Sequence, residues 1–454
     1  MTQEEALDIL RLGYNVFLTG PAGSGKTFLL NKYIEYLKEN NKRVGITAST
    51  GIAATHINGI TIHSWSGMGI KNNLSREDIR KLVKRSYLRK RFKNTGVLII
   101  DEISMLNDFQ LDLVNQICQS FKNNQKPFGG MQIVCSGDFF QLPPIKKEGE
   151  AKFVTESKIW DNMKLKICYL EEQHRQEKEE KLYALLNNIR NNKVEEVENL
   201  LTSIDYEKKK SFLEMTKLYT HNINVDAINN FELSKIPGEI LAYDMQSRGN
   251  RNIVEALKSG SLASERLTLK KGAKVMFIKN NFEQGYINGT LGRIIGFNDY
   301  RMPIVQILAG RKIEAEPATW TIEEDNIIKA EIRQIPLRLA WAITVHKSQG
   351  MNLDAAEIDL SKSFVEGMGY VALSRLRSLE GLKLLGINKM AFMVNKKVLE
   401  LDKNLKQMSE NNVEKLEKVS REEKEKRQKN FLEQLPIVIT DKNIKQKKKI
   451  YLKS

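Results

Sequence analysis

The stretch NVFLTGPAGSGKTFLL, residues 15–30, decides the fold of the first part of this sequence. An apolar run ends in a glycine-rich loop, GPAGSGKT at 20–27, and a helical pattern follows the loop. The loop matches G-x-x-x-x-G-K-[ST] between a strand and a helix. Its glycines let backbone N–H groups wrap around phosphates, and the helix N-terminus adds the positive end of a dipole. The spacing and context favour a nucleotide-binding P-loop over a chance glycine-rich turn.

Each residue of this loop then has a predicted place in nucleotide binding. The Lys26 ammonium is expected to reach the β- and γ-phosphates of ATP, and the Thr27 hydroxyl to hold Mg²⁺. The predicted nucleotide ligands of the loop are Gly20, Pro21, Ala22, Gly23, Ser24, Gly25, Lys26 and Thr27.

Two adjacent carboxylates, Asp101 and Glu102, end a second apolar run, VLIIDE at 97–102. A buried strand that ends in acid is costly unless a cation or a reaction meets the carboxylates there. We expect Asp101 to bind Mg²⁺, directly or through water, and Glu102 to orient or deprotonate the attacking water. The alternative is a helix cap or a surface ion pair at Asp101, and the intact P-loop argues against it.

Two more apolar runs, RVGITASTG at 43–51 and MQIVCSGD at 131–138, also end in small and polar residues. Continuous apolar strands that alternate with helical patterns predict an α/β fold with a parallel sheet covered on both faces. Ligands bind at the carboxyl ends of such strands, so the polar clusters should converge on one site. Gln141, in GDFFQLPP at 137–144, is then placed to sense the γ-phosphate.

The composition is that of a globular protein with a basic surface. The 454 residues are 41% hydrophobic and 28% charged, with a formal net charge of +16. No apolar run is long enough to span a bilayer, and the acidic start MTQEEALDIL is unlike a secretory signal. Cys118, Cys135 and Cys168 should be buried thiols in a reducing compartment. We expect a cytoplasmic, nucleoid-associated protein with a polyanion partner such as nucleic acid and no membrane partner.

A second α/β pattern begins near residue 171 and includes IPLRLAWAITVHKSQG at 335–350. Short alternating runs with glycine turns, at about 266–334, indicate a small antiparallel β-insert within it. In the first half, residues 70–93 form an insert with ten Lys or Arg against two acids. The stretch after residue 403 is dense in charge, which favours a solvated helix or disorder.

Arginines and histidines accompany these motifs. Arg175 in LEEQHRQ and Arg375 in ALSRLRS could stabilise charge on the γ-phosphate from a second lobe, or form ordinary surface ion pairs. His63 beside Trp65 is the best candidate for contact with phosphate or base, although Trp65 is equally compatible with the core. The other histidines, which also lack a metal-binding spacing and could be buried or capping residues, are His56, His174, His221 and His346.

Taken together, these segments resemble the successive motifs of the Pif family (petite integration frequency) of superfamily 1B helicases. The matching segments are GPAGSGKT, TASTGIAATHINGITIHSWSGMG, DEISML, PFGGMQIVCSGDFFQLPP, LEEQHRQ, AWAITVHKSQGMNLD and GYVALSRLRS. NQKPFGGMQIVCSGDFFQLPP resembles the signature that separates this family from its RecD-like and Dda-like relatives. The resemblance covers about residues 1–400 and is that of a minimal, bacterial-type core.

The resemblance implies two RecA-like parallel-sheet lobes, at 1–170 and 171–402, with ATP in the cleft between them. The basic insert, about 66–96, would be a wedge subdomain on lobe one. The β-insert, about 266–334, would be an SH3-like subdomain on lobe two. Residues 403–454 would be a charged tail outside the family core, partly helical or disordered.

The resemblance also implies roles for single residues. Gln3 resembles the glutamine that reads adenine, and Gly350 falls in a motif at the nucleotide site. Arg175 and Arg375 match two arginine fingers, which act with Lys26, Glu102 and Gln141 in catalysis. The residues in motifs that contact the DNA strand are Thr50, Gly51, His63, His346 and Lys347.

The implied function is an ATP-dependent DNA helicase. It would hydrolyse ATP with Mg²⁺, move 5′ to 3′ on single-stranded DNA, and unwind duplexes and forks that carry a 5′ tail. ATP would favour a closed cleft between the lobes, and hydrolysis would release it. We expect a monomer, and the sequence names no protein partner. The alternatives are a RecD-like or Dda-like motor, or a DNA-binding scaffold in which nucleotide is only a structural ligand.

Overall fold

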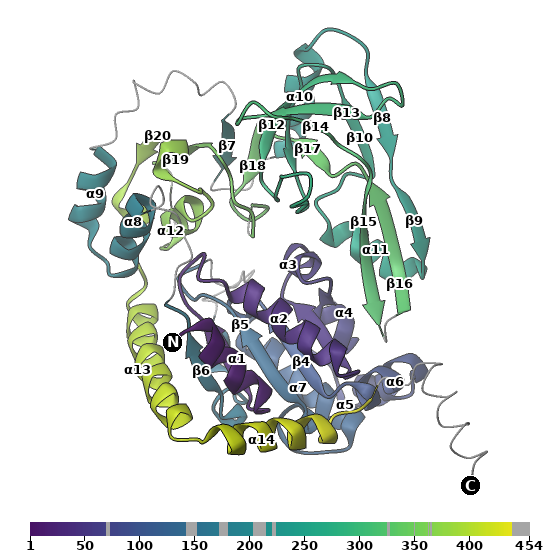
Figure 1. Ribbon diagram of the computed structural model, residues 1–454, viewed down its shortest axis with the longest axis vertical. Helices are drawn as coiled ribbons and strands as arrows, with labels where there is room; N and C mark the ends of the chain where they lie inside the picture. Colours follow the sequence, from purple (N-terminus) through teal and green to yellow (C-terminus); the bar gives the residue numbers. More distant parts are fainter. Residues whose placement is uncertain are drawn as a thin grey trace.

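Two parallel β-sheets organise the computed structural model shown in Figure 1. The structure describes residues 1–69, 73–141, 152–171, 180–202, 215–219, 224–324, 327–348, 350–361, 363 and 366–437. Arg175, His174 and His221, which were singled out from the sequence, lie outside the described residues.

The first sheet contains the P-loop strand and the three strands that were predicted to converge with it. All of its strand pairings are parallel. In spatial order the strands are β3 (Ile60–Thr61), β2 (Val44–Ala48), β4 (Val97–Asp101), β5 (Gln132–Ser136), β1 (Val16–Thr19) and β6 (Lys166–Tyr169). Because β4, β5 and β1 are neighbours, their carboxyl ends meet at one edge of the sheet, as predicted.

Alternate residues of these strands pack on opposite faces of the sheet. Val16 and Leu18 lie in one core with α1 and α2, whereas Phe17 lies in a second core with α7. This burial on both faces explains why the strands are apolar throughout. The helices of this part are α1 (Gln3–Arg11), α2 (Lys26–Glu39), α3 (Gly51–His56), α4 (Ile62–Ser66), α5 (Arg76–Val83), α6 (Ser86–Asn94) and α7 (Asp108–Lys122).

The three cysteines are confirmed as buried free thiols. Cys135 belongs to β5 and Cys168 to β6, so they face opposite cores of the first lobe. Burial raises the pKa of Cys168 to about 12. A thiol with so high a pKa is a poor nucleophile and metal ligand at neutral pH, which fits a packing role.

The second sheet is also parallel and completes the predicted α/β architecture of two RecA-like lobes. Its strands, in spatial order, are β18 (Ala342–Thr344), β7 (Thr216–Tyr219), β19 (Ala356–Leu360) and β20 (Leu382–Ile387). The helices of this part are α8 (Glu180–Arg190), α9 (Val194–Thr202), α10 (Val225–Lys235) and α12 (Met368–Leu373). In Figure 1 this lobe lies above the first one.

Antiparallel strands extend from the second lobe at the upper right of Figure 1. They begin before residue 266, because β8 pairs with β10 and β9 pairs with β16. One helix, α11 (Arg251–Gly260), lies among them. The strands are β8 (Leu241–Asp244), β9 (Gln246–Gly249), β10 (Arg266–Leu269), β11 (Lys274–Phe277), β12 (Leu291–Phe297), β13 (Pro303–Ile307), β14 (Lys312–Glu314), β15 (Ala318–Glu324), β16 (Ile327–Gln334) and β17 (Leu337–Leu339).

The charged C-terminal part forms two helices through Gln434, α13 (Lys396–Glu417) and α14 (Arg421–Gln434). They run along the first lobe at the left and bottom of Figure 1. Ser409 accepts a hydrogen bond of 3.0 Å from the Tyr169 backbone N–H, and Asn412 donates one of 3.1 Å to the Ile167 carbonyl. These bonds attach α13 directly to β6.

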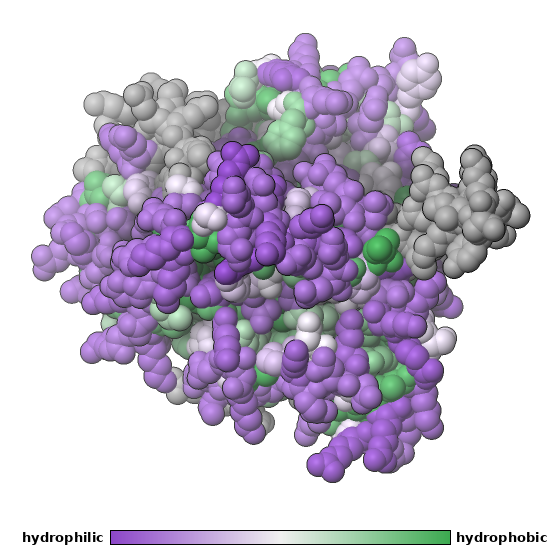
Figure 2. All heavy atoms as spheres, turned by 60° about the horizontal axis from the view of Figure 1, so that its bottom comes forward, coloured by the Kyte–Doolittle hydropathy of each residue, from purple (hydrophilic) through white to green (hydrophobic). Residues whose placement is uncertain are grey.

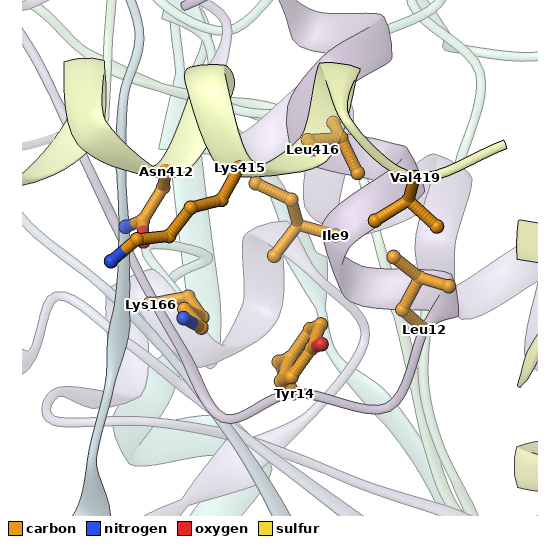
Figure 3. Close-up of a pocket in the computed structure, with 8 residues that line it drawn as sticks. All are labelled: Ile9, Leu12, Tyr14, Lys166, Asn412, Lys415, Leu416 and Val419. Carbon is orange, nitrogen blue, oxygen red and sulfur yellow. The ribbon is translucent and has the colours of Figure 1, made fainter.

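The contact between α13 and α1 is apolar but not filled. Ile9 of α1 and Leu12, which follows that helix, face Leu416 of α13 and Val419 across a cavity of about 40 Å³ (Figure 3). Figure 2, which brings the lower end of Figure 1 forward, shows hydrophilic side chains over most of that face. α13 therefore buries a narrow, mostly apolar stripe, whereas α14 has no buried residue.

Candidate nucleotide and nucleic-acid site

The P-loop connects β1 to the first turn of α2. Gly25 has a φ of 84° and caps α2, a left-handed conformation that a side chain would strain. A Cβ atom there would also collide with the side-chain amide of Gln3. The loop therefore needs glycine at this position both for its conformation and for the close approach of Gln3.

The Lys26 ammonium is turned back onto its own loop. Its Nζ donates hydrogen bonds of 2.9 Å to the carbonyls of both Gly20 and Pro21. Burial lowers the pKa of Lys26, and the negative charges of Asp138 and Glu102 oppose that shift. The structure thus places Lys26 among the carboxylates at the end of the sheet.

Asp101 and Glu102 lie where β4 ends, as predicted. Asp101 is buried, and its carboxylate accepts a hydrogen bond of 2.9 Å from the Glu102 N–H. Glu102 has a φ of 51°, which is a strained, left-handed conformation for a glutamate. Burial and the neighbouring Asp101 raise the pKa of Glu102 to about 7, while Lys26 and Arg375 oppose the shift. A strained residue with a perturbed pKa is typical of functional sites.

Two glutamines border the same edge of the sheet. The Gln141 side chain is buried, and its Oε1 has no hydrogen-bond partner among the residues that the structure describes. A buried polar atom that lacks a partner needs an explanation, and a bound ligand or water is the usual one. Gln3 is also buried and donates a long hydrogen bond of 3.4 Å to the Ser24 carbonyl of the P-loop.

Arg375 approaches this edge from the second lobe. It follows α12, is buried, and donates hydrogen bonds to the Val371 carbonyl at 3.1 Å and the Ser374 hydroxyl at 2.9 Å. The helix before it contacts the P-loop, because the Ala22 N–H donates a hydrogen bond of 3.1 Å to the Tyr370 hydroxyl of α12, and the positive charge of Arg375 opposes the raised pKa of Glu102. The structure therefore brings together Lys26, Asp101, Glu102, Gln141 and Arg375.

The residues predicted to contact DNA on the first lobe lie at the start of α3 and in α4. Thr50 caps α3 by accepting a hydrogen bond of 3.2 Å from Ala53 N. Gly51 begins α3 and packs so closely on Gly260 of α11 that a Cβ atom would collide with it. The His63 ring lies 3.2 Å from the side-chain amide of Gln110 on α7.

Trp65 belongs to the core, which is one of the two possibilities left open by the sequence. It is buried and packs edge-on against Phe92, with ring centroids 4.7 Å apart. Arg91 from the basic insert donates a hydrogen bond of 2.7 Å to the Trp65 carbonyl. Buried Leu88 and Phe92 fix one face of α6 in the core, while Lys84, Arg85, Arg89 and Lys90 are exposed.

On the second lobe, His346 and Lys347 follow β18, and Lys347 donates a hydrogen bond of 3.2 Å to Asp226. Gly350, with a φ of 72°, packs against His56 of the first lobe. The His56 ring also lies 3.2 Å from the Asn288 amide. Burial and Arg375 lower the pKa of His56 to about 4, so this histidine is neutral at physiological pH.

Three buried residues near the site were not assigned a role from the sequence. They are Asp138 after β5, Arg190 at the end of α8 and Tyr370 in α12. Asp138 and Tyr370 stand in quoted motifs without a role. Arg190 follows the apolar positions of α8 at helical spacing, which was the available signal for a buried charge.

Magnesium fits the residues at the end of the first sheet. Thr27 and Asp101 offer hard oxygen ligands beside the P-loop. The described residues hold no group of three or more His, Cys, Asp or Glu side chains that could form a metal site alone. Few protein ligands suit Mg²⁺, which usually takes one or two carboxylates together with substrate phosphates. Within the described part of the chain, every helix is too short or too polar to cross a bilayer.

Comparison with known proteins agrees with these motifs. The model for PIF1-like helicases matches residues 3–207, and the model for the DNA helicase Pif1 2B domain matches residues 252–297. The ATP-dependent DNA helicase Pif1 of Psychrobacter sp. is 45% identical over 93% of this chain and 73% of its own length. The chain spans 63% of the matching Xenopus laevis and Danio rerio proteins.

Solved structures give the same result. Bacteroides sp Pif1 in complex with ADP-AlF4 has a TM-score of 0.77 and 33% identity, over 90% of this chain and 97% of that chain. Bacteroides Pif1 bound to ssDNA has a TM-score of 0.59 and 31% identity, over 90% and 97% of the two chains. The chain therefore belongs to the Pif1 family of ATP-dependent DNA helicases.

Proposed function

We propose that this chain hydrolyses ATP with Mg²⁺, moves 5′ to 3′ on single-stranded DNA and unwinds the duplex ahead of it. One observation carries the proposal: the P-loop, Asp101 and Glu102 share one edge of a sheet, and α12 of the other lobe, which directly precedes Arg375, contacts the P-loop at Ala22. The complexes of related proteins with ADP-AlF4 and with ssDNA support the same two ligands for this chain. Forked duplex DNA is likewise a partner of a related Pif1 structure.

ATP would displace the contacts that Lys26 makes within its own loop. The Nζ now bonds to two backbone carbonyls, and phosphate oxygens would be stronger, charge-assisted acceptors. Gln3, which already contacts Ser24, would read the adenine, and Gly350 would line the cleft from the second lobe. The P-loop residues Gly20 to Thr27 would surround the phosphates.

Thr27 and Asp101 would hold the Mg²⁺, which supplies positive charge to the phosphate oxygens when it is bound. Glu102 would take the proton of the attacking water, because a carboxyl with a pKa of about 7 accepts a proton well near neutral pH. Gln141, whose Oε1 has no hydrogen-bond partner among the described residues, would sense the γ-phosphate through its side-chain amide. Arg375, with Arg175, would stabilise the charge that develops on the γ-phosphate.

Motion on DNA would follow from the division of the site between lobes 1–170 and 171–402. ATP would favour the closed cleft because both lobes contribute to its binding, and hydrolysis would release them. Phosphate and base contacts are proposed for Thr50, Gly51, His63, His346 and Lys347. The basic insert, at about 66–96, would act as a wedge at the fork. The β-insert would be an SH3-like subdomain and residues 403–454 an auxiliary tail. We propose that a monomer is sufficient.

The site is tested by ATP hydrolysis with and without single-stranded DNA. We expect Lys26→Ala and Glu102→Gln each to lower DNA-stimulated turnover by about 10² to 10⁴-fold. Arg375→Ala should lose turnover but keep ADP binding, because its contact would matter most in the transition state. Near-normal turnover in Glu102→Gln would remove its proposed role. DNA binding by the wild-type protein without any turnover would instead favour the scaffold alternative.

A further inference from the structure

Arg190 lies where the two lobes meet. It ends α8, on the side of the second lobe, and its side chain is only 4% exposed. One of its partners, Tyr169, ends β6 in the first lobe, and another, Asp402, lies in α13. Arg190 therefore links α8 to the first lobe and to α13.

The guanidinium makes a dense set of short hydrogen bonds. Its Nη1 donates to both carboxylate oxygens of Asp138 at 2.9 Å and to the Tyr370 hydroxyl at 3.1 Å. Its Nη2 donates to the Tyr169 hydroxyl at 2.8 Å and to Asp402 at 2.9 Å. Charge-assisted bonds in a buried setting hold their partners in fixed positions.

Asp138 and Tyr370 connect Arg190 to the P-loop through hydrogen bonds. The Tyr370 hydroxyl donates to Asp138 at 2.9 Å and accepts a hydrogen bond of 3.1 Å from the Ala22 N–H. With its bond from Arg190, the hydroxyl uses its one donor and two acceptor positions. Ala22 belongs to the P-loop, so one tyrosine oxygen ties α12 to the nucleotide site.

The same short helix leads to Arg375, five residues after Tyr370. A shift of α12 relative to the P-loop would therefore move the arginine that faces Glu102. Misplacement of about 1 Å can reduce an enzymatic rate by about 10²-fold. We therefore expect the position of Arg375 relative to the P-loop to depend on the bond between Tyr370 and Ala22.

We propose that Arg190, Asp138 and Tyr370 are positioning residues for ATP hydrolysis. Arg190 fixes the Asp138 carboxylate, Asp138 fixes the Tyr370 hydroxyl, and Tyr370 holds α12 and Arg375 against the P-loop. None of the three needs to touch the nucleotide. The inference rests on the proposed hydrolysis of ATP at this P-loop.

The mildest test removes one oxygen atom. Tyr370→Phe keeps the buried ring but deletes the hydrogen bonds with Ala22, Asp138 and Arg190. We expect kcat for DNA-stimulated ATP hydrolysis to fall by at least about 10-fold, with KM for ATP and Kd for ADP changed less than about 3-fold. This split is expected when a group acts on the transition state rather than on binding.

Tyr33→Phe is the matched control. Tyr33 is also fully buried, and its hydroxyl donates a hydrogen bond of 2.6 Å to Gln132 at the amino end of β5, away from the P-loop. We expect Tyr33→Phe to lower the melting temperature about as much as Tyr370→Phe while leaving kcat unchanged. Equal kcat values in the two variants would show that the Tyr370 hydroxyl is only structural, and would overturn the proposal.

Arg190→Lys tests the origin of the chain of contacts. Lysine keeps the charge but lacks the planar fork, so it cannot make all five hydrogen bonds. The proposal expects lower kcat with nearly unchanged ADP affinity, and wild-type kcat in this variant would contradict it. A wild-type protein that binds DNA but does not hydrolyse ATP would reject the proposed function itself, which is a distinct result.

Discussion

The carboxyl edge of the first sheet and the cluster around Arg190 are close together, but they differ in whether their buried polar groups have hydrogen-bond partners. At the sheet edge, Ser24 Oγ and Gln141 Oε1 are buried without a hydrogen-bond partner among the described residues. There, too, the pKa of Glu102 is raised. Around Arg190, by contrast, the guanidinium reaches acceptors from Asp138, Tyr370, Tyr169 and Asp402.

This contrast distinguishes groups whose hydrogen-bond partner would be a ligand from groups that fix the positions of neighbouring side chains. Buried acceptors without hydrogen-bond partners, and a buried carboxyl with a raised pKa, lower the stability of the fold. Such groups are typical of sites where a bound substrate supplies the missing partners. A fully bonded ion cluster fixes the relative positions of its members. The two regions should therefore respond to mutation in opposite directions.

The largest expected effect is the loss of the cluster. Arg190→Ala would leave the buried carboxylate of Asp138 without its cation, whereas Asp402 would keep its ion pair with Lys406. We expect the free energy of unfolding to fall by about 3–5 kcal/mol. Urea denaturation of the full chain without nucleotide measures it.

The control for this prediction is an exposed ion pair. Arg421 is 92% exposed and pairs with Glu425 at 2.9 Å in α14. Arg421→Ala should change stability by less than about 0.5 kcal/mol. If Arg190→Ala lowers the free energy of unfolding as little as Arg421→Ala does, the Arg190 cluster does not stabilise the contact between the lobes.

At the sheet edge, a substitution is expected to raise the free energy of unfolding rather than to lower it. Burial and Asp101 raise the pKa of Glu102 from 4.5 to about 7, so the fold favours the protonated form. Its contribution to stability is full below pH 4.5 and is lost as the pH rises through 7. Glu102→Gln stays neutral, and should stabilise the nucleotide-free protein by about 1–3 kcal/mol at pH 8.

This gain should shrink as the pH is lowered from 8 toward 5, which melting curves at several pH values would show. Glu77→Gln is the control, because Glu77 is 74% exposed in its pair with Lys81. It should show no such dependence on pH. A Glu102→Gln variant that is no more stable than wild type at pH 8 would mean that Glu102 ionises freely in the fold.

The smallest effect is expected from exposed charge. Replacing Lys84, Arg85 and Lys90 by alanine should weaken unwinding by several-fold at moderate salt and change ATP hydrolysis little, because phosphate contacts are screened by ions. Arg91 is left out, since it supports the Trp65 carbonyl. Strand-separation assays at two salt concentrations measure the effect.

The comparison set for these three residues is another exposed lysine group, Lys397, Lys403 and Lys418 in and after α13. Removing that group takes away the same charge far from the proposed wedge and should leave unwinding unchanged. Wild-type unwinding by the Lys84, Arg85 and Lys90 variant at both salt concentrations would reject the wedge proposal.

The sheet edge could be predicted from the sequence because its signals are local. GPAGSGKT and VLIIDE each place a loop or a carboxylate at the end of an apolar strand, and parallel strands must end together. The orientation of Trp65 was not decidable in this way. Its burial depends on Phe92, which the sequence alone does not place beside it.

The Arg190 cluster depends on contacts that are distant in sequence. Leu182, Leu185, Leu186 and Ile189 form an apolar stripe in α8, and Arg190 continues it. This pattern indicates a buried charge but gives no partner, because the partners lie 52, 180 and 212 residues away. The packing of the C-terminal helices on the first lobe could not be predicted from the sequence for a similar reason. Some of their apolar contacts, such as Leu416, are isolated within charged sequence.

The central claim is a motor with a fixed direction on DNA. The most direct measurement is strand separation on two duplexes, one with a 5′ single-stranded tail and one with a 3′ tail, with and without ATP and Mg²⁺. The account predicts ATP-dependent opening of the 5′-tailed duplex alone, and no opening by Glu102→Gln. Opening of the 3′-tailed duplex alone, or of neither while the protein remains bound to DNA, would contradict it.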